Sequence, residues 1–278
     1  MNDLASTIAD HGLDNPTSAG FRRGQNIIAV ASGKGGVGKT WFSITLAHSL
    51  AKMGKNVLLF DGDLGLANVD VQLGLMPKRD LNDVIRGRLT LEHVVQRFDE
   101  GGFDIIAGRS GQASLSALPS QRLLMLRDQL LDVAAKYDVV IIDLGAGVDR
   151  TVRMFAAMAT KTLLVTTDEP TSLTDAYAFI KLGNAAGVSK HVNIVVNMAA
   201  SVIEGEKTYR TLLKACENFL RLSPPLAGMV RQDAKVKDTI RHQTPILVRS
   251  PNADAAEDVQ KVARFVAKEL LEAKHMVG

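Results

Sequence analysis

The sequence predicts a doubly wound α/β fold, in which a mostly parallel sheet of seven to eight strands carries helices on both faces. One observation is that short, apolar, β-branched runs alternate with longer stretches of helical periodicity, as in buried parallel sheets. A second is that polar residues follow these runs, so a parallel sheet would gather them along the edge where such folds bind ligands. The residues at these strand ends are Ser32, Gly33, Asp61, Asp143, Asp168 and Asn197.

The strands of this sheet follow one another in chain order. Five runs predict clear strands, at residues 27–31, 57–60, 139–142, 163–166 and 194–196. Weaker runs bring the number to about seven, and they lie at 103–107 and 226–230. A helix is expected over residues 41–53, directly after the first strand.

The C-terminal segment predicts a last packing helix, because four apolar residues recur at helical spacing. They are Val259, Val262, Val266 and Leu270, with Phe265 and Leu271 flanking. A membrane-binding helix should instead show a basic polar face. The polar residues here balance acidic against basic charge, which favours packing inside the domain.

Composition and charge limit the function classes. The 278 residues have a net charge of only +3 and 5% aromatic residues, which disfavours a nucleic-acid-binding surface. No apolar stretch approaches the roughly 20 residues that a membrane-spanning helix needs. Cys216 is the single cysteine, which fits reducing, cytoplasmic surroundings. We expect one domain over residues 26–278, after a flexible tail or short helix at 1–25.

The strongest motif is a phosphate loop of the pattern G-x-x-x-x-G-K-[ST], which follows the first strand and opens the first helix. Its glycines let backbone N–H groups converge on phosphate oxygens, and the helix N-terminus adds a favourable dipole. Lys39 is expected to reach the β- and γ-phosphates, and Thr40 to hold Mg²⁺. The loop residues are Gly33, Lys34, Gly35, Gly36, Val37, Gly38, Lys39 and Thr40.

A second lysine, Lys34, stands early in this loop. With it, the segment Lys-Gly-Gly-x-Gly-Lys-Thr resembles the deviant phosphate loop of the MinD/ParA ATPases. The resemblance implies a P-loop NTPase of the SIMIBI type that binds ATP and Mg²⁺. It also implies that Lys34 is catalytic together with Lys39, because it reaches across a dimer interface to the partner's nucleotide. A solvated loop lysine is the alternative.

Three carboxylates at strand ends can meet Mg²⁺ or orient an attacking water, as phosphoryl transfer requires. By resemblance to MinD, Asp63 positions the water and Asp61 supports the metal or its water shell. Asp143 closes the most apolar strand and is expected to hold Mg²⁺ as the Walker B carboxylate. Leu144 stands where the family usually has a hydroxyl next to the γ-phosphate, a departure that a slow or regulated ATPase would tolerate. Helix capping is the alternative role for Asp61 and Asp63.

The base of the nucleotide is expected near Asn197, whose amide can both donate to and accept from an adenine edge. MinD-like proteins use an asparagine at this strand end. Val230 and Arg231 lie where the family often shows G-x-[IV]-P-x-D, with Arg231 in place of the proline. Lys237 lies where relatives carry a basic residue, and Glu169 is expected to face the partner subunit beside the nucleotide. As alternatives, Asn197 caps a loop, Lys237 is a surface lysine, and Glu169 belongs to the start of a helix.

Two further stretches, residues 63–79 and 168–177, are similar to the FlhG/FleN regulators of flagellar number, a MinD-like branch. That resemblance implies a homodimer formed with ATP, slow Mg²⁺-dependent hydrolysis, and control of flagellar number or placement through protein partners. The implied partners are a flagellar GTPase, C-ring components or a transcriptional activator. The expected place is the cytoplasm, with peripheral contact at the inner membrane left open.

Other functions on this fold are weighed by what they require. A metal-cluster carrier needs paired cysteines, and a tyrosine kinase needs a tyrosine-rich tail; the chain has one cysteine and three tyrosines. A nucleotide-binding regulator with little turnover stays open. So does a partitioning or cell-division positioning ATPase, for which nonspecific DNA binding would use the basic cluster Arg221, Arg231, Lys235, Lys237 and Arg241.

Overall fold

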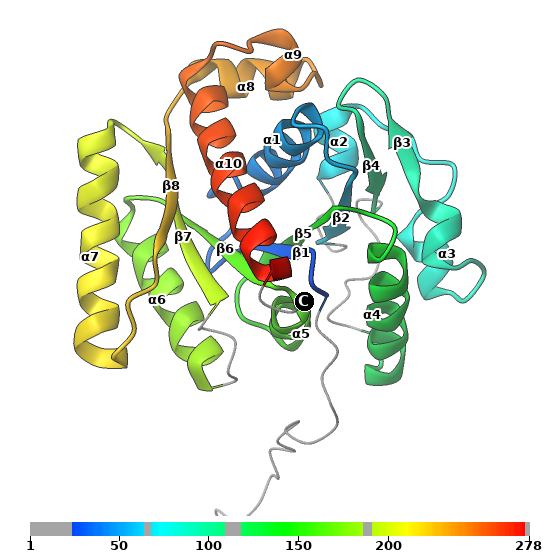
Figure 1. Ribbon diagram of the computed structural model, residues 1–278, viewed down its shortest axis with the longest axis horizontal. Helices are drawn as coiled ribbons and strands as arrows, with labels where there is room; N and C mark the ends of the chain where they lie inside the picture. The colour runs from blue at the N-terminus through cyan, green and yellow to red at the C-terminus, as the bar shows by residue number, and fades with distance from the viewer. Residues whose placement is uncertain (1–23, 64–67, 109–117, 186–190, 276–278) are drawn as a thin grey trace, which may run out of the picture.

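The computed structural model describes residues 24–63, 68–108, 118–185 and 191–275 (Figure 1). The predicted tail, at 1–25, therefore lies almost wholly outside the described residues. Within them, eight strands form one sheet in the order β3-β4-β2-β5-β1-β6-β7-β8. The strands are β1 (Ile27–Ser32), β2 (Val57–Gly62), β3 (Gln96–Phe98), β4 (Phe103–Ile106), β5 (Val139–Ala146), β6 (Lys161–Thr166), β7 (Val192–Ala199) and β8 (Leu226–Arg231).

The mostly parallel, doubly wound sheet is confirmed, and the sequence missed one strand. Every neighbouring pair runs parallel except β3 and β4, which are antiparallel. Strand β3 has three residues and only Phe98 among them is buried. Because it lies at the sheet edge, it lacks the continuous apolar run that marks the buried strands.

Helices cover both faces of the sheet, as Figure 1 shows. Strand residues alternate between two buried clusters; in β1, for example, Ile27 faces one and Ile28 the other. One face carries α3 (Leu81–Ile85), α4 (Ser120–Ala134), α5 (Arg150–Met158), α6 (Pro170–Ala185) and α7 (Val202–Leu220), with the short 3₁₀ helix η2 (Leu91–Val94). The other carries α1 (Lys39–Lys52), α2 (Val69–Leu73), α8 (Ala234–Arg241), α9 (Ile246–Arg249) and α10 (Asp254–His275).

The last helix, α10, packs inside the domain as predicted. Its apolar stripe is buried against the cluster that includes α1 and β8, while Leu271 is half exposed. Residues of the stripe are Val259, Val262, Val266 and Leu270. Among the described residues, no helix combines the length and the apolar character that crossing a membrane requires.

The same alternation places the polar residues of the strand ends. In β2 and β5, Asp61 and Asp143 are register partners and lie on the face covered by α1. Helix α1 begins at Lys39, directly after the glycine-rich loop, and Pro170 opens α6 beyond the end of β6. The fold thus brings the loop, the paired carboxylates and the start of α6 to one edge of the sheet.

Candidate nucleotide site

The glycine-rich loop has a conformation that its sequence requires. Gly36 and Gly38 both have φ of +82°, a left-handed backbone that glycine adopts without strain. A Cβ on Gly38 would lie 2.5 Å from Nδ2 of Asn197, and one on Gly33 would lie 2.4 Å from the backbone of Asp175. Next to Gly35 and Gly36 there is open space, so their N–H groups border a cradle that an anion can enter.

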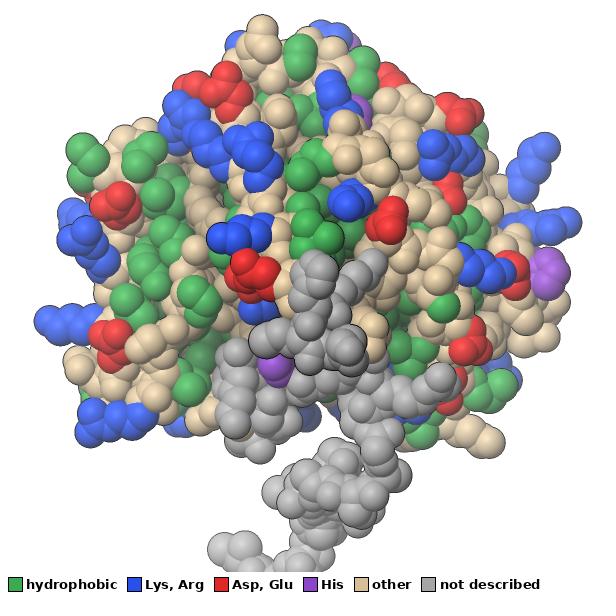
Figure 2. Space-filling view, in the orientation of Figure 1, with side chains coloured by type: hydrophobic (Ala, Val, Ile, Leu, Met, Phe, Trp, Pro, Cys, Tyr) green, Lys and Arg blue, Asp and Glu red, His purple; other side chains and the backbone are tan. Residues whose placement is uncertain are grey.

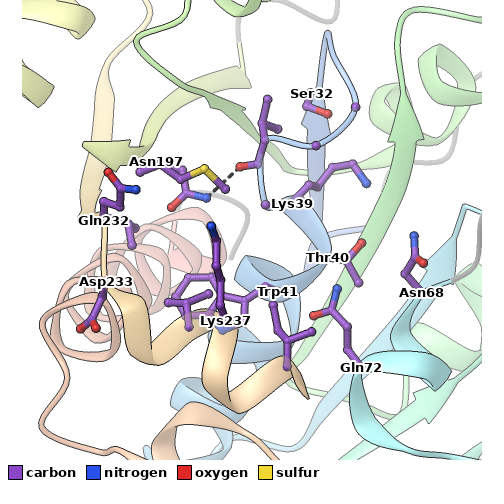
Figure 3. Close-up of a pocket in the computed structure, with 18 of the residues that line it drawn as sticks. Ser32, Lys39, Thr40, Trp41, Asn68, Gln72, Asn197, Gln232, Asp233 and Lys237 are labelled. Atoms are coloured by element: carbon purple, nitrogen blue, oxygen red, sulfur yellow. Dashed lines mark hydrogen bonds between the residues drawn. The ribbon is translucent and has the colours of Figure 1, made fainter. Parts of the chain in front are cut away.

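A cavity of about 920 Å³ opens above this loop (Figure 3). The loop and the start of α1 form one wall, and Asn197, Met198 and the end of β8 form another. Helix α8 and residues of α2 complete the lining, with Lys237 reaching into the cavity from α8 (Figure 3). The volume falls within the roughly 300–1,000 Å³ of ordinary ligand sites.

Asp143 is the centre of a buried polar network behind the loop. Its carboxylate is fully buried and lies 3.2 Å from Nζ of Lys39. The hydroxyls of Thr40 and Ser43 donate to it at 2.6 and 3.0 Å. These contacts bring together Asp143 and Thr40, two of the three residues predicted at the Mg²⁺ site. Ser43 belongs to the same network and was not predicted from the sequence.

Asp61 lies beside Asp143 on the neighbouring strand and is also fully buried. The backbone N–H of Asp63 donates to its carboxylate at 3.2 Å. Burial and the nearby charge of Asp143 raise the pKa of Asp61 well above its usual range. A cation placed between the two carboxylates would favour their ionised forms, which is consistent with the predicted role of Asp61 near a metal.

Asp63 lines the cavity, whereas Leu144 does not. The side chain of Leu144 is 1% exposed and packs in the cluster on the face opposite α1. A Cβ on Gly145 would lie 3.6 Å from Oδ1 of Asp63, and Ala146 lines the cavity. Strand alternation turns the side chain of Leu144 to the other face of the sheet, so it does not occupy the space beside the predicted phosphate position.

Lys34 makes its contacts at the start of α6. Its Nζ lies 2.6 Å from Oε2 of Glu169 and 2.8 Å from Oγ1 of Thr171. The two charged side chains are 37% and 62% exposed, so the pair lies at the open rim of the site. Glu169 thus contacts Lys34 and is not part of the cavity wall; its role toward a nucleotide stays a prediction. Thr171 is a partner that the sequence did not indicate.

The residues predicted around the base come together beside β7. Asn197 is 3% exposed and donates from Nδ2 to the carbonyl of Val37 at 2.8 Å, which ties it to the loop. Val230, Arg231 and Lys237 line the same cavity. The guanidinium of Arg231, however, pairs with Asp254 and Asp258 of α10, so this side chain is already bound within the protein. Trp41, Gln72 and Gln232 also line the cavity and were not predicted.

Comparison with known proteins identifies the family. A family model described as "ParA: NUBPL iron-transfer P-loop NTPase" matches residues 23–267. The chain belongs to the ParA family. Members of this family are ATPases, and this ParA-family protein is accordingly an ATP-binding ATPase.

Three relatives illustrate what this ParA-family protein is similar to. It is 40% identical over 240 residues to the antiactivator FleN of Pseudomonas aeruginosa, covering 86% of this chain and 85% of FleN. It is 31% identical over 276 residues to the flagellum site-determining protein YlxH of Helicobacter pylori, covering 97% and 92%. Among solved structures, it is similar to the MinC:MinD cell division protein complex of Aquifex aeolicus, with a TM-score of 0.70, 26% identity, and 87% and 96% coverage.

Proposed function

We propose that this ParA-family ATPase is an ATP-driven dimeric switch that regulates flagellar number or placement through protein partners. The observation that carries the proposal is the position of Lys34, a charged loop residue at the open rim of the nucleotide cavity. Its partners Glu169 and Thr171 lie at the same rim, so Lys34 can exchange them for groups of a second subunit, while Lys39 stays buried beside Asp143. Partner binding would then depend on which nucleotide holds the two subunits together.

The residues present fit ATP and Mg²⁺. The open cradle at Gly35 and Gly36 suits phosphate oxygens, and Lys39 supplies a cation at the entrance of α1. Thr40 and Asp143, already in hydrogen-bond contact, would hold the metal, with Asp61 behind them. Bound Mg²⁺ would supply charge neutralisation for the phosphates.

Hydrolysis in this proposal uses Asp63 to orient a water toward the terminal phosphate. Asp63 borders the cavity and is held close to Gly145, at the end of β5. Leu144 is buried on the face opposite this cavity, so position 144 contributes no group to this step. Slow turnover that a partner protein accelerates is part of the proposal.

The flagellar role is supported by the similarity to YlxH, a flagellum site-determining protein, and the regulatory role by the similarity to the antiactivator FleN. A transcriptional activator, a flagellar GTPase and C-ring components are the partner classes proposed. A DNA-partitioning role is less well supported, because the basic cluster is divided in the fold and Lys and Arg side chains on the face shown in Figure 2 are interspersed with acidic and hydrophobic ones. Arg231 is bound by Asp254 and Asp258, and Lys237 reaches into the cavity.

An iron-transfer role, which the family description mentions, lacks support in this chain. Cys216 is buried in α7, and burial together with Glu217 raises the pKa of its thiol to about 11. A thiol that stays protonated is a poor metal ligand, because the thiolate is the binding form.

The proposal is tested by counting flagella in cells of the source organism that carry the parent gene, no gene, or the Lys39→Ala or Lys34→Ala variant. We expect deletion and both variants to change flagellar number or position, while the parent gene restores it. Normal flagella in the deletion strain, together with misplaced division septa or lost plasmids, would contradict the flagellar role and favour a positioning or partitioning ATPase.

A further inference from the structure

The segment from Val230 to Asp233 forms the cavity wall beside Asn197, and its position depends on a helix outside the cavity. Two of its anchors involve β7 and α8: the N–H of Gln232 donates to the carbonyl of Ala199 in β7 at 2.8 Å, and Asp233 caps α8. The third anchor comes from α10. There, Asp258 accepts hydrogen bonds from both the backbone and the side chain of Arg231.

Asp254 and Asp258 of α10 hold Arg231 by several hydrogen bonds and ion pairs, and this set of contacts is called the clamp. Asp258 Oδ2 lies 2.6 Å from Nε and 3.2 Å from the backbone N of Arg231, and Oδ1 lies 3.0 Å from one terminal nitrogen. Asp254 adds an ion pair at 3.0 Å to the other terminal nitrogen. Bidentate pairs of this kind fix orientation as well as contributing energy. Since the side chain of Asp258 is only 4% exposed, water competes poorly for these bonds.

The backbone bond is the decisive part of this clamp. Because the N–H of Arg231 donates to Asp258, the main chain at the end of β8 is held to α10 at the point where it enters the cavity wall. Burial raises the pKa of Asp258, and the hydrogen bonds from Arg231 and Lys261 lower it. The net shift of the pKa is downward, so the carboxylate stays ionised at neutral pH. Asp258 itself does not line the cavity.

We propose that Asp258 is a positioning residue for nucleobase recognition, acting through Arg231 on the wall formed by residues 230–233. A protein distinguishes bases by hydrogen bonds to the edge of the base. If the wall shifts, its hydrogen-bonding groups no longer pair with the correct base, and the preference over other bases falls. The phosphate cradle, at the start of α1, is held independently by the loop and by Asn197. The inference rests on the proposed nucleotide site.

The test measures dissociation constants of the full chain for Mg-ATP, Mg-GTP and inorganic tripolyphosphate by calorimetry. In Asp258→Asn we expect ATP binding to weaken about tenfold, the size of one lost charge-assisted hydrogen bond. The preference for ATP over GTP should fall, and tripolyphosphate affinity should not change. Arg231→Gln is the second variant, because Asp258 keeps Lys261 as a partner at 2.7 Å and is not left unpaired. It should show the same base-specific loss.

Lys261→Ala is the matched control, since it removes a cation from Asp258 but leaves the clamp; it should bind all three ligands as the parent does. Parent-like selectivity in both clamp variants would overturn the inference. The inference would also be overturned if affinity for tripolyphosphate fell as much as affinity for ATP, if the control lost affinity, or if both clamp variants unfolded. In each case the clamp would act on the stability of the protein. A parent protein that binds neither ATP nor tripolyphosphate would instead overturn the proposed function, and this inference with it.

Discussion

Replacing Lys34 by alanine separates the contact that this side chain makes within its own chain from the contact proposed with a second subunit. In the structure its Nζ lies 2.6 Å from Glu169 and 2.8 Å from Thr171, at an exposed position. An exposed ion pair contributes about 0–1 kcal/mol to folding. The variant should therefore fold, and it should bind ATP nearly as well as the parent, because the backbone amides and Lys39 hold the phosphates.

The effect on association should be much larger. A lysine that reaches the partner's phosphates makes a desolvated charge contact, and loss of such a contact costs about 2–5 kcal/mol. At 1.4 kcal/mol for each factor of ten, each lost contact weakens dimer formation about thirtyfold to several-thousand-fold, and a symmetric dimer loses two such contacts. At micromolar protein, Lys34→Ala should then stay monomeric and almost inactive with ATP present.

Light scattering with a non-hydrolysable ATP analogue measures this directly. Thr171→Ala is the matched control, since it removes one contact of Lys34 within the chain and leaves the lysine free to reach a partner. The control should dimerise at least as well as the parent. A Lys34→Ala protein that dimerises with parental affinity would refute the cross-interface role and leave a solvated loop lysine.

Three further predictions follow from buried or cavity-lining groups. Lys39→Ala should abolish ATP binding, because the phosphates lose their buried cation; retained micromolar affinity in calorimetry would contradict the loop assignment. Asp63→Ala should bind ATP normally but hydrolyse it slowly and accumulate as the ATP-bound dimer, which a phosphate-release assay checks; normal turnover would show that another group orients the water. Burial and Lys52 lower the pKa of His48 to about 4. Between pH 6.5 and 4 the unfolded chain binds a proton that the folded chain excludes, so stability falls by about 3 kcal/mol as the pH drops. His48→Gln should lose less stability over this window in thermal melts, and equal slopes would count against the assignment.

The sequence predicted the sheet and the phosphate loop well because both depend on local pattern. Apolar runs marked the buried strands, and a continuous motif marked the loop. The resemblance placed position 144 next to the γ-phosphate, whereas alternation along β5 turns the side chain of Leu144 away from Asp143 and into the core. The partners of Lys34 and Arg231 were also missed, since Glu169 and Asp258 lie 135 and 27 residues away along the chain. Such pairs depend on tertiary packing, and no spacing rule identifies them.

The central claim, that ATP drives two copies of this chain together, is tested most directly by the molar mass of the unmodified protein in solution. With Mg-ADP, light scattering should give the monomer mass of 29.9 kDa. With Mg²⁺ and a non-hydrolysable ATP analogue, the same sample should give about twice that mass. A mass that stays at the monomer value with the analogue bound would contradict the account.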